Sequence, residues 1–303
     1  MRFCVFETAA GPHLGCAPDV HDEYVVDLTS DWPRDDSRLP PPADVAELAI
    51  LGDAGIEVAR TLARAGKTKL EIAHLSLLAP VPRPRRNVFC VGRNYREHII
   101  EGNAARGLDT AELPKFIQLF TKATSAVIGP GATIPLHAGL TRLLDYEAEL
   151  AIVIGRGGCD ISEADAMSAV FGYTIVNDVT ARDLQRRHDQ WFKGKSLDGS
   201  CPMGPWVVHK SALADPHALS IRLWVNGELR QNSNTSQMIF KVPNIIADLS
   251  AGLTLEAGDV IATGTPSGVG YAMKPPCALQ EGDVVAVEIE GIGRLENVVR
   301  DVR

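Results

Sequence analysis

A proline-rich segment divides this chain of 303 residues into two parts of different character. It reads Ala79-Pro-Val-Pro-Arg-Pro-Arg-Arg, with three prolines at alternate positions. Proline has no backbone N–H to donate to a β-ladder, and it favours an extended conformation in the residue before it. We therefore expect an irregular linker here, which separates a small N-terminal α+β domain at residues 1–80 from a larger domain at residues 81–303.

The N-terminal part combines short strands with an alanine-rich segment that has helical periodicity. The apolar residues of this segment fall roughly on one helical stripe, formed by Ala46, Leu48, Ala49, Ile56, Ala59, Leu62 and Ala63. Gly52 and Gly55 interrupt the stripe, so two short helices fit the pattern as well as one long helix does. The first residues of the chain are interpreted as a β-strand and not as a signal peptide.

The sequence after the linker is dominated by strand signals. Apolar or alternating runs predict strands at residues 87–91, 144–154, 171–176, 219–225 and 228–231. The last two are joined by Asn226-Gly227, the dipeptide that most strongly predicts a β-hairpin. Short helices are predicted after the capping residue Ser162, at residues 180–188 and at residues 243–250. The predicted class is therefore α+β and rich in β-structure.

Composition and charge argue against several classes of function. The formal net charge is −8 and no long run of Lys or Arg occurs, so we expect no nucleic-acid partner. No apolar run reaches the roughly 18 residues of a membrane helix, so we expect no membrane segment. The six cysteines show no C-x-x-C spacing, which favours a reducing, cytoplasmic location over a disulfide framework or a zinc site. Gly155-Arg-Gly-Gly lacks the third glycine of a dinucleotide fingerprint, so NAD binding is rejected.

Acidic residues stand at alternate positions near the start of the run at residues 143–154. Because side chains alternate between the two faces of a strand, Asp145, Glu147 and Glu149 should share one face. Carboxylates this close repel one another unless water or a cation lies between them. A strand face exposed to water explains the pattern as well as a metal site does.

A further acid, Asp178, ends the apolar strand predicted around residues 171–176 and so should lie at the mouth of a buried core. Together with Glu147 and Glu149 it forms a ligand set made only of oxygens, which suits Mg²⁺, Mn²⁺ or Ca²⁺ and not zinc. Three protein ligands would leave open positions for water and substrate. Asp178 also suits the N-cap of a following helix, and the two roles are compatible.

Two polar groups could serve the chemistry of such a site. His98 and Glu101 are three residues apart, so on a helix they would share a side, and a His oriented by a carboxylate is a common general base. An incidental surface pair is the alternative. Arg182, Gln185 and Lys195 follow Asp178 and would suit an anionic substrate, although an ordinary amphipathic helix has the same pattern. The glycine-rich run at residues 262–270 could present backbone N–H groups to a carboxylate or phosphate.

Taken in order, these segments resemble the fumarylacetoacetate hydrolase family over roughly residues 85–300. The segments that carry the resemblance are Val91-Gly-Arg-Asn-Tyr-Arg-Glu-His98-Ile-Ile-Glu101, Phe120-Thr-Lys122, Asp145-Tyr-Glu147-Ala-Glu149-Leu, Gly172-Tyr-Thr-Ile-Val-Asn-Asp178-Val-Thr-Ala-Arg182-Asp-Leu-Gln185, Gly194-Lys195-Ser-Leu-Asp, Pro202-Met-Gly-Pro205 and Gly264-Thr265-Pro-Ser-Gly268. Several motifs that agree in order are far more specific than any one of them. The larger namesake enzymes carry a fourth metal-binding acid near the position of Val91, which this chain lacks, so it resembles the smaller bacterial-type members.

The resemblance implies a mixed β-roll, β-sandwich-like core, a homodimer and a small anionic oxo acid as substrate. It implies a Mg²⁺ site, or a Mn²⁺ or Ca²⁺ site, with ligands Glu147, Glu149 and Asp178. Residues of the catalytic machinery would be His98 and Glu101, which activate water, and Lys195. Residues that contact the substrate would be Arg182, Gln185 and Thr265.

The chemistry expected of such a site is stabilisation of an enolate by the metal. Our leading hypothesis is hydrolysis of a C–C bond in an acylpyruvate or a related 1,3-diketo acid, and the expected setting is aromatic catabolism. An oxaloacetate-type decarboxylase and a 2-hydroxy-dienoate isomerase are alternatives, because one site can form the same enolate in all three reactions. A binding protein that uses the metal without catalysis is the alternative from a different class. The role of residues 1–80 is open, and support of a dimer is our expectation.

Overall fold

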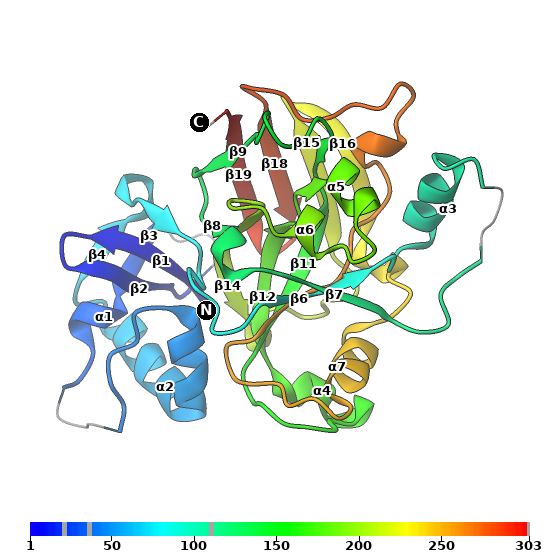
Figure 1. Cartoon of the computed structure of the whole chain (residues 1–303). Helices are drawn as coiled ribbons and strands as arrows, with labels where there is room; N and C mark the ends of the chain where they lie inside the picture. Colours follow the sequence, from blue (N-terminus) through cyan, green and yellow to red (C-terminus); the bar gives the residue numbers. More distant parts are fainter. Residues whose placement is uncertain (20–22, 35–37, 109–111, 302–303) are drawn as a thin grey trace.

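A computed structural model of the chain describes residues 1–19, 23–34, 38–108 and 112–301. Two β-sheets form the main body, and a smaller N-terminal part lies beside them (Figure 1). Helices are short and lie around the sheets, except for one longer helix in the N-terminal part. The predicted α+β, β-rich class with a sandwich-like core is confirmed.

The larger sheet runs through both parts of the chain. In spatial order its strands are β4 (Lys69–Glu71), β3 (Tyr24–Asp27), β2 (Gly11–Ala17), β1 (Arg2–Thr8), β14 (Cys201–His209), β12 (Val170–Asn177), β11 (Ala148–Ile154), β17 (Val260–Ala262), β6 (Val88–Gly92) and β7 (Gln118–Lys122). Two short strands join it at the side, β5 (Leu77–Leu78) on β1 and β8 (Val127–Ile128) on β14. The ladder between β1 and β14 links the N-terminal part to the main body, with Arg2 opposite Val208. A domain boundary at residue 80 stays a prediction.

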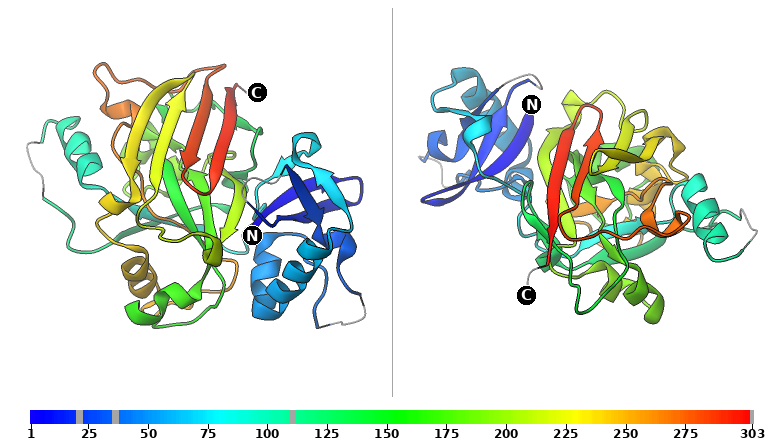
Figure 2. Two further views of the ribbon diagram at one scale, coloured as in Figure 1. Left: turned by 180° about the vertical axis from the view of Figure 1, so that it is seen from behind. Right: turned by 90° about the horizontal axis from the view of Figure 1, so that it is seen from above.

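The second sheet contains the predicted hairpin. Its strands are β16 (Glu228–Asn234), β15 (Ser220–Val225), β18 (Val284–Ile289), β19 (Gly293–Arg300) and β9 (Thr133–Pro135). The left view of Figure 2 shows β15, β16, β18 and β19 of this sheet, in yellow to red, in front of the green strands of the larger sheet. The hairpin turn has φ of 51° at Asn226 and 79° at Gly227, as a two-residue turn of the type favoured by this dipeptide requires.

Strand β11 is buried on both faces, which explains why its sequence is almost continuously apolar. Leu150 and Ile152 belong to a core shared with Leu223 of the second sheet. Ala151 and Val153 point to the opposite face and belong to a core shared with residues of β1 and of the N-terminal helix. Alternate side chains of one strand therefore hold two cores together, and the end of this strand is fixed in position.

Helices form in each of the segments where the sequence predicted them, and the long N-terminal helix is kinked. They are α1 (Leu28–Asp31), α2 (Val45–Ala65), α3 (Arg96–Ala104), α4 (Glu163–Ala169), α5 (Arg182–Arg187), α6 (Phe192–Lys195) and α7 (Val242–Ser250), and a 3₁₀ turn that matters for the site is η5 (Gly270–Ala272). α2 is interrupted at Gly52, where φ is 60°, so the alternative of two helices joined at a glycine is the better description. Ser162 caps α4 by accepting a hydrogen bond from the N–H of Asp165, as predicted.

Two predicted elements differ from the observed ones. The strand predicted at residues 144–154 is broken: β10 (Leu144–Asp145) leaves the sheet, and β11 begins at Ala148. The helix predicted at residues 180–188 begins as β13 (Thr180–Ala181), and only then does α5 start. Both differences have one cause, because β10 and β13 pair with each other in a small separate ladder. This ladder leaves Tyr146 and Glu147 at a bend.

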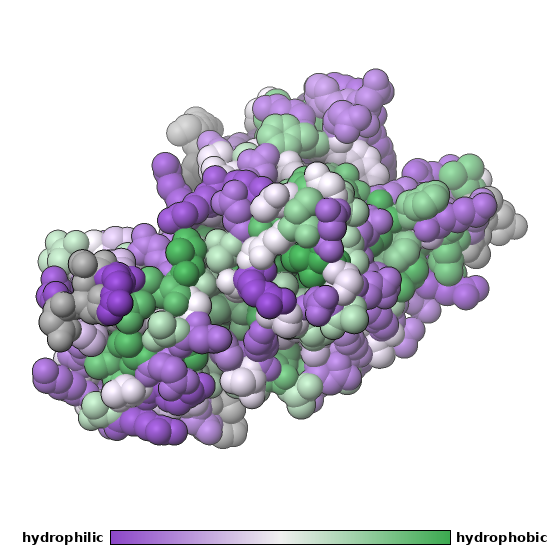
Figure 3. Space-filling model, turned by 90° about the horizontal axis from the view of Figure 1, so that it is seen from below, coloured by the Kyte–Doolittle hydropathy of each residue, from purple (hydrophilic) through white to green (hydrophobic). Residues whose placement is uncertain are grey.

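The surface mixes hydrophilic and apolar side chains. On the face shown in Figure 3, hydrophilic residues are interspersed with apolar ones. Some large apolar side chains are exposed, and Phe116 is the most exposed of those described, at 79%. No helix in the described ranges is long and apolar enough to cross a bilayer.

Candidate active site and metal centre

Three acidic side chains meet at one edge of the larger sheet, where strand β11 begins and its neighbour β12 ends. Glu149 is the second residue of β11, Glu147 directly precedes that strand, and Asp178 directly follows β12. The two strands are antiparallel with Ala148 opposite Asn177, which brings Asp178 beside Glu147. The N–H of Asp178 donates to the carbonyl of Glu147 at 2.8 Å. One carboxylate oxygen from each acid lies within 4.8 Å of the others.

Burial decides between the alternatives that the sequence left open. Glu147 is 4% exposed, Glu149 is 1% exposed and Asp178 is fully buried, so the interpretation as a strand face in water is wrong. The interpretation of Asp178 as an N-cap is also wrong, because the next helix, α5, has Ala181 at that position. Three buried carboxylates this close need positive charge nearby.

Buried cations supply part of that charge. The Nζ of Lys195 donates to Glu147 Oε2 at 2.7 Å and to Asp178 Oδ2 at 2.6 Å, and the Nζ of Lys122 donates to Asp178 Oδ1 at 2.6 Å. Arg182 forms an ion pair with Glu147 at 2.6 Å. Burial alone would raise the pKa of Glu147, but the charges of Lys195 and Arg182 outweigh it and hold this pKa well below its usual range. Burial would lower the pKa of Lys195, but Asp178 and Glu147 raise it above its ordinary value, so Lys195 remains an ammonium ion.

Glu149 is the acid without a cationic partner among the described residues. Its carboxylate accepts a hydrogen bond from the N–H of Gly264 at 2.7 Å. Burial raises the pKa of Glu149 well above its usual range, and the charges of Asp178 and Glu147 raise it further. With Asp145, four buried carboxylates face the three buried cations, so negative charge is in excess at Glu149. A divalent cation that prefers oxygen ligands fits both the charge and the donor set.

Asp145 does not join the three acids, although strand alternation places it on their face. It lies before the bend, in β10, and its carboxylate accepts four hydrogen bonds. The donors are the N–H groups of Tyr146 (2.9 Å), Gly270 (2.8 Å) and Tyr271 (3.1 Å) and the Nε of Arg182 (2.9 Å). Asp145 therefore fixes the guanidinium of Arg182 against the acid cluster. The sequence did not reveal this role, because three of the partners come from distant segments.

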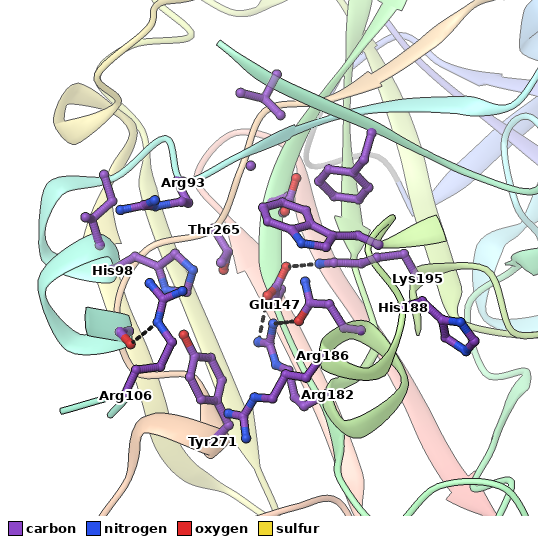
Figure 4. Close-up of a pocket in the computed structure, with 18 of the residues that line it drawn as sticks. Arg93, His98, Arg106, Glu147, Arg182, Arg186, His188, Lys195, Thr265 and Tyr271 are labelled. Atoms are coloured by element: carbon purple, nitrogen blue, oxygen red, sulfur yellow. Dashed lines mark hydrogen bonds and ion pairs between the residues drawn. The ribbon is translucent and has the colours of Figure 1, made fainter. Parts of the chain in front are cut away.

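The predicted pair of His98 and Glu101 forms on helix α3. Nδ1 of His98 lies 3.0 Å from Oε1 of Glu101, so the other ring nitrogen, Nε2, is left for a ligand. The second oxygen of Glu101 accepts the N–H of Gly268 at 2.9 Å, which ties the helix to the glycine-rich run. Figure 4 shows His98 across the cavity from Glu147.

The glycine-rich run after β17 holds carboxylates, as predicted, but these carboxylates belong to the chain itself. Its N–H groups donate from Gly264 to Glu149 (2.7 Å), from Gly268 to Glu101 (2.9 Å) and from Gly270 to Asp145 (2.8 Å). One loop therefore positions an acid of the cluster, the acid of the His–Glu pair and the acid that orients Arg182. The hydrogen bonds come from the backbone, so the loop is a rigid template for the site.

A cavity of about 360 Å³ brings the predicted groups together (Figure 4). The predicted residues that line it are His98, Glu147, Glu149, Arg182, Gln185, Lys195 and Thr265. Asp178 and Glu101 are not in the lining; they lie behind it, bonded to Lys195 and His98. Gln185 accepts from Nη1 of Arg182 at 3.4 Å, and Thr265 accepts from Nε2 of Gln231 at 2.9 Å.

The structure adds cavity residues that the sequence did not single out. Arg93, Arg106 and Tyr271 line the cavity, and the ring of Tyr271 lies under the guanidinium of Arg182 at 4.4 Å from its centroid. Lys122, the buried partner of Asp178, does not line the cavity but lies behind the residues that do. Arg93 and Lys122 lie inside the segments that carry the family resemblance, but a motif does not tell which of its side chains face the cavity.

Several known proteins are similar to this chain over nearly its whole length. Residues 87–300 match the family model described as fumarylacetoacetate (FAA) hydrolase C-terminal. Oxaloacetate tautomerase YisK from Bacillus subtilis (strain 168) is 45% identical over 307 residues, which cover 99% of this chain and all of that protein. The structure of a fumarylacetoacetate hydrolase from Exiguobacterium antarcticum is similar with a TM-score of 0.84 and 44% identity, over 100% of both chains. Maleylpyruvate hydrolase from Sphingobium sp. SYK-6, solved with manganese(II) and pyruvate, is similar with a TM-score of 0.76 and 31% identity, over 99% of both chains.

Proposed function

The chain belongs to the fumarylacetoacetate hydrolase family, and from that premise we propose that it interconverts the keto and enol forms of oxaloacetate with a divalent cation. The chain is thus an enzyme of a family whose members include metal-binding proteins that act on small organic acids. The proposed ligands are Glu147, Glu149 and Asp178, and the proposed ion is Mg²⁺. The tautomerase that is 45% identical over its full length supports the choice of reaction.

One observation carries the proposal: His98, whose ring is held by Glu101, lines the same cavity as Glu147 and Glu149 of the buried acid cluster. A general base and an electrophilic centre that face one substrate are what enolisation requires. At about 360 Å³ the cavity is near the small end of ligand pockets, which run to about 1,000 Å³, and this suits a four-carbon acid.

The proposed reaction moves one proton between two positions of the substrate. Glu101 holds the Nδ1 side of His98, and the free Nε2 takes a proton from C3 of keto-oxaloacetate. The electron pair of the broken C–H bond forms the C2–C3 double bond. The proton on Nε2 of His98 is then transferred to the C2 oxygen, which gives the enol and returns His98 to its neutral form. A bound divalent cation would supply a Lewis acid for the negative charge on that oxygen. Lys195, held as an ammonium ion, adds positive charge beside it.

Hydrolysis of an acylpyruvate remains the second candidate, because the same pair could take a proton from water. His98 with Glu101 would then direct hydroxide to the distal carbonyl, and the C–C bond would break to leave the enolate of pyruvate. An oxaloacetate-type decarboxylase or a 2-hydroxy-dienoate isomerase would use the same enolate without water. These reactions differ in products, so one set of assays separates them.

The decisive experiment follows the ultraviolet absorbance of enol-oxaloacetate with protein and Mg²⁺, while lactate dehydrogenase and NADH report any pyruvate in a parallel sample. We expect faster decay of the enol, no pyruvate above the uncatalysed rate, and loss of the effect with EDTA. Acetylpyruvate is the comparison substrate for hydrolysis. Pyruvate release from acetylpyruvate without faster ketonisation of oxaloacetate would overturn the proposal in favour of hydrolysis.

We also propose that the chain acts as a homodimer and that residues 1–80 support the dimer. The ladder between β1 and β14 fixes the N-terminal part to the catalytic body and so gives it a defined place in an assembly. Size-exclusion chromatography with light scattering tests this directly. A monomeric mass at the concentration of the activity assay would contradict it.

A further inference from the structure

Two arginine side chains line the cavity without a carboxylate partner in the part of the chain that the structure describes. Arg93 follows β6 and has no hydrogen bond or ion pair to a described side chain. Arg106 is held by neutral acceptors, the carbonyl of Gly102 at 3.1 Å and Oδ1 of Asn103 at 2.6 Å. The other arginine bonded in the site, Arg182, is committed to two acids. Arg93 and Arg106 therefore bring positive charge to the cavity, and no carboxylate of the described residues forms an ion pair with either of them.

These two guanidinium groups also act on each other. Burial lowers the pKa of Arg93 below its ordinary value, and the positive charge of Arg106 lowers it further. Two like charges therefore act on each other at the cavity, and an anion bound between them would reduce their repulsion. In Figure 4 both arginines lie on the same side as His98, and Glu147 and Lys195 lie opposite.

The backbone holds Arg93 in a fixed place. Arg93 has φ of 56°, in the left-handed region that few residues other than glycine adopt. The next residue, Asn94, is fully buried, and its side chain donates to the carbonyls of Phe240 (3.0 Å) and Thr263 (2.8 Å) and accepts from the N–H of Phe240 (2.7 Å). A loop fixed in this way presents the arginine with little loss of freedom on binding.

We propose that Arg93, assisted by Arg106, binds the distal carboxylate of the substrate and makes the site selective for 2-oxo dicarboxylates of four carbons. This inference rests on the proposed function, which identifies the 2-oxo acid end of the substrate as the end that reacts. The 2-oxo carboxylate lies at the acid cluster, the distal carboxylate lies at Arg93, and C3 between them faces His98. Charge-assisted hydrogen bonds from a guanidinium to a carboxylate are among the strongest that proteins form.

Other charged groups of the cavity do not provide this selectivity. Asp189 lines the cavity and is acidic, but it forms no ion pair with a described arginine. Arg186 also lines the cavity, but it is exposed and lies over the ring of Tyr271 at 5.4 Å from the centroid. Arg93 differs from Asp189 and Arg186 because it combines partial burial, a fixed backbone and a neighbouring positive charge.

The test uses two ligands that do not react and that differ at one position. Malate carries a carboxylate where 2-hydroxybutyrate carries a methyl group, and both keep the 2-hydroxy acid end. Calorimetry in the presence of Mg²⁺ gives the ratio of their affinities for the wild type, Arg93→Met, Arg93→Lys and Arg96→Met. Arg96 is the matched control, because it is exposed on α3 and does not line the cavity.

We expect the wild type to prefer malate by about 10- to 100-fold, the range for a charge-assisted hydrogen bond. Arg93→Met should remove most of this preference and leave 2-hydroxybutyrate binding unchanged, which also shows that the variant is folded. Arg93→Lys should keep part of the preference, and Arg96→Met all of it. A preference that survives in Arg93→Met, or a wild type that binds both ligands equally or neither, would overturn the inference. Failure of oxaloacetate ketonisation alone would instead count against the proposed reaction and leave the binding ratio as the test of Arg93.

Discussion

Replacing Glu149 by Gln tests whether the acid cluster is built for a metal. Gln has nearly the same shape as Glu and can still accept the hydrogen bond from the N–H of Gly264, but it carries no charge. Glu149 is 1% exposed and has no cationic partner among the described residues, so its charge is the one in excess. The metal-free protein should therefore become more stable, whereas the response to metal should disappear.

The magnitude follows from the raised pKa. A buried acid whose pKa is higher in the folded protein than in the unfolded chain stabilises the fold least at high pH. Above the unfolded value of about 4.3, each pH unit costs about 1.4 kcal/mol until the folded pKa is reached. The pKa of Glu149 lies well above its usual range, so its charged form destabilises the fold near pH 7. An uncompensated buried charge costs about 3–5 kcal/mol. The amide avoids this penalty, so we expect a gain of about 1–3 kcal/mol, after allowance for a buried NH₂ group.

The assay is thermal unfolding in EDTA and in Mg²⁺, at several pH values. In EDTA, Glu149→Gln should melt several degrees above the wild type near pH 7, and the difference should shrink as the pH falls toward 4–5. In Mg²⁺ at about 100 times its Kd, the wild type should gain about 2.7 kcal/mol, and the variant should gain almost nothing. Glu296→Gln is the control, because Glu296 lies on strand β19 and is exposed.

Two results would refute this reasoning separately. If Glu149→Gln keeps the wild-type response to Mg²⁺, the residue is not a ligand of the metal. If it melts below the wild type in EDTA near pH 7, the negative charge at Glu149 is not in excess, and the balance between four carboxylates and three cations is wrong.

The remaining contacts of the site predict distinct phenotypes for three kinds of substitution. His98→Asn and Glu101→Gln should each slow oxaloacetate ketonisation by about 10²- to 10⁴-fold while the rise in Tm with Mg²⁺ persists; loss of that rise would contradict a role in proton transfer alone. Lys122→Met leaves Asp178 with an unpaired buried oxygen, so denaturant titration should show a loss of about 3–5 kcal/mol. Adding Asp178→Asn should recover part of it, and purely additive losses would argue against the pair. Gly268→Ala, at φ of 104° and against the backbone of β16, should lower both Tm and activity, and an unchanged Tm would show that the loop adapts.

Local patterns in the sequence were sufficient for many elements of the fold. The turn at Asn226-Gly227 and the cap at Ser162 depend on backbone preferences of a few neighbouring residues, and both were predicted correctly. The apolar run before Asp178 predicted a buried strand, and β12 is buried along its whole length. The break at residues 146–147 was not predictable, because it results from the pairing of β10 with β13, which lies more than 30 residues further along the chain.

In the candidate site, too, the sequence predicted some features and only the tertiary structure decided others. The spacing and type of the acids indicated Glu147, Glu149 and Asp178 as metal ligands, and the order of the motifs indicated the family. Both can be read from the sequence, because they depend only on residue type and position along the chain. Whether those acids face water or each other was decided by burial on both faces of the sheet.

The tertiary structure alone decided which charges compensate which. Lys122 pairs with Asp178 across 56 positions of the chain, and Asp145 is bonded to groups more than 120 positions away. The same holds for Arg93, because only the folded structure shows that no described carboxylate forms an ion pair with it. Electrostatic energy depends on distance and burial, and the order of residues along a chain specifies neither until the strands have paired.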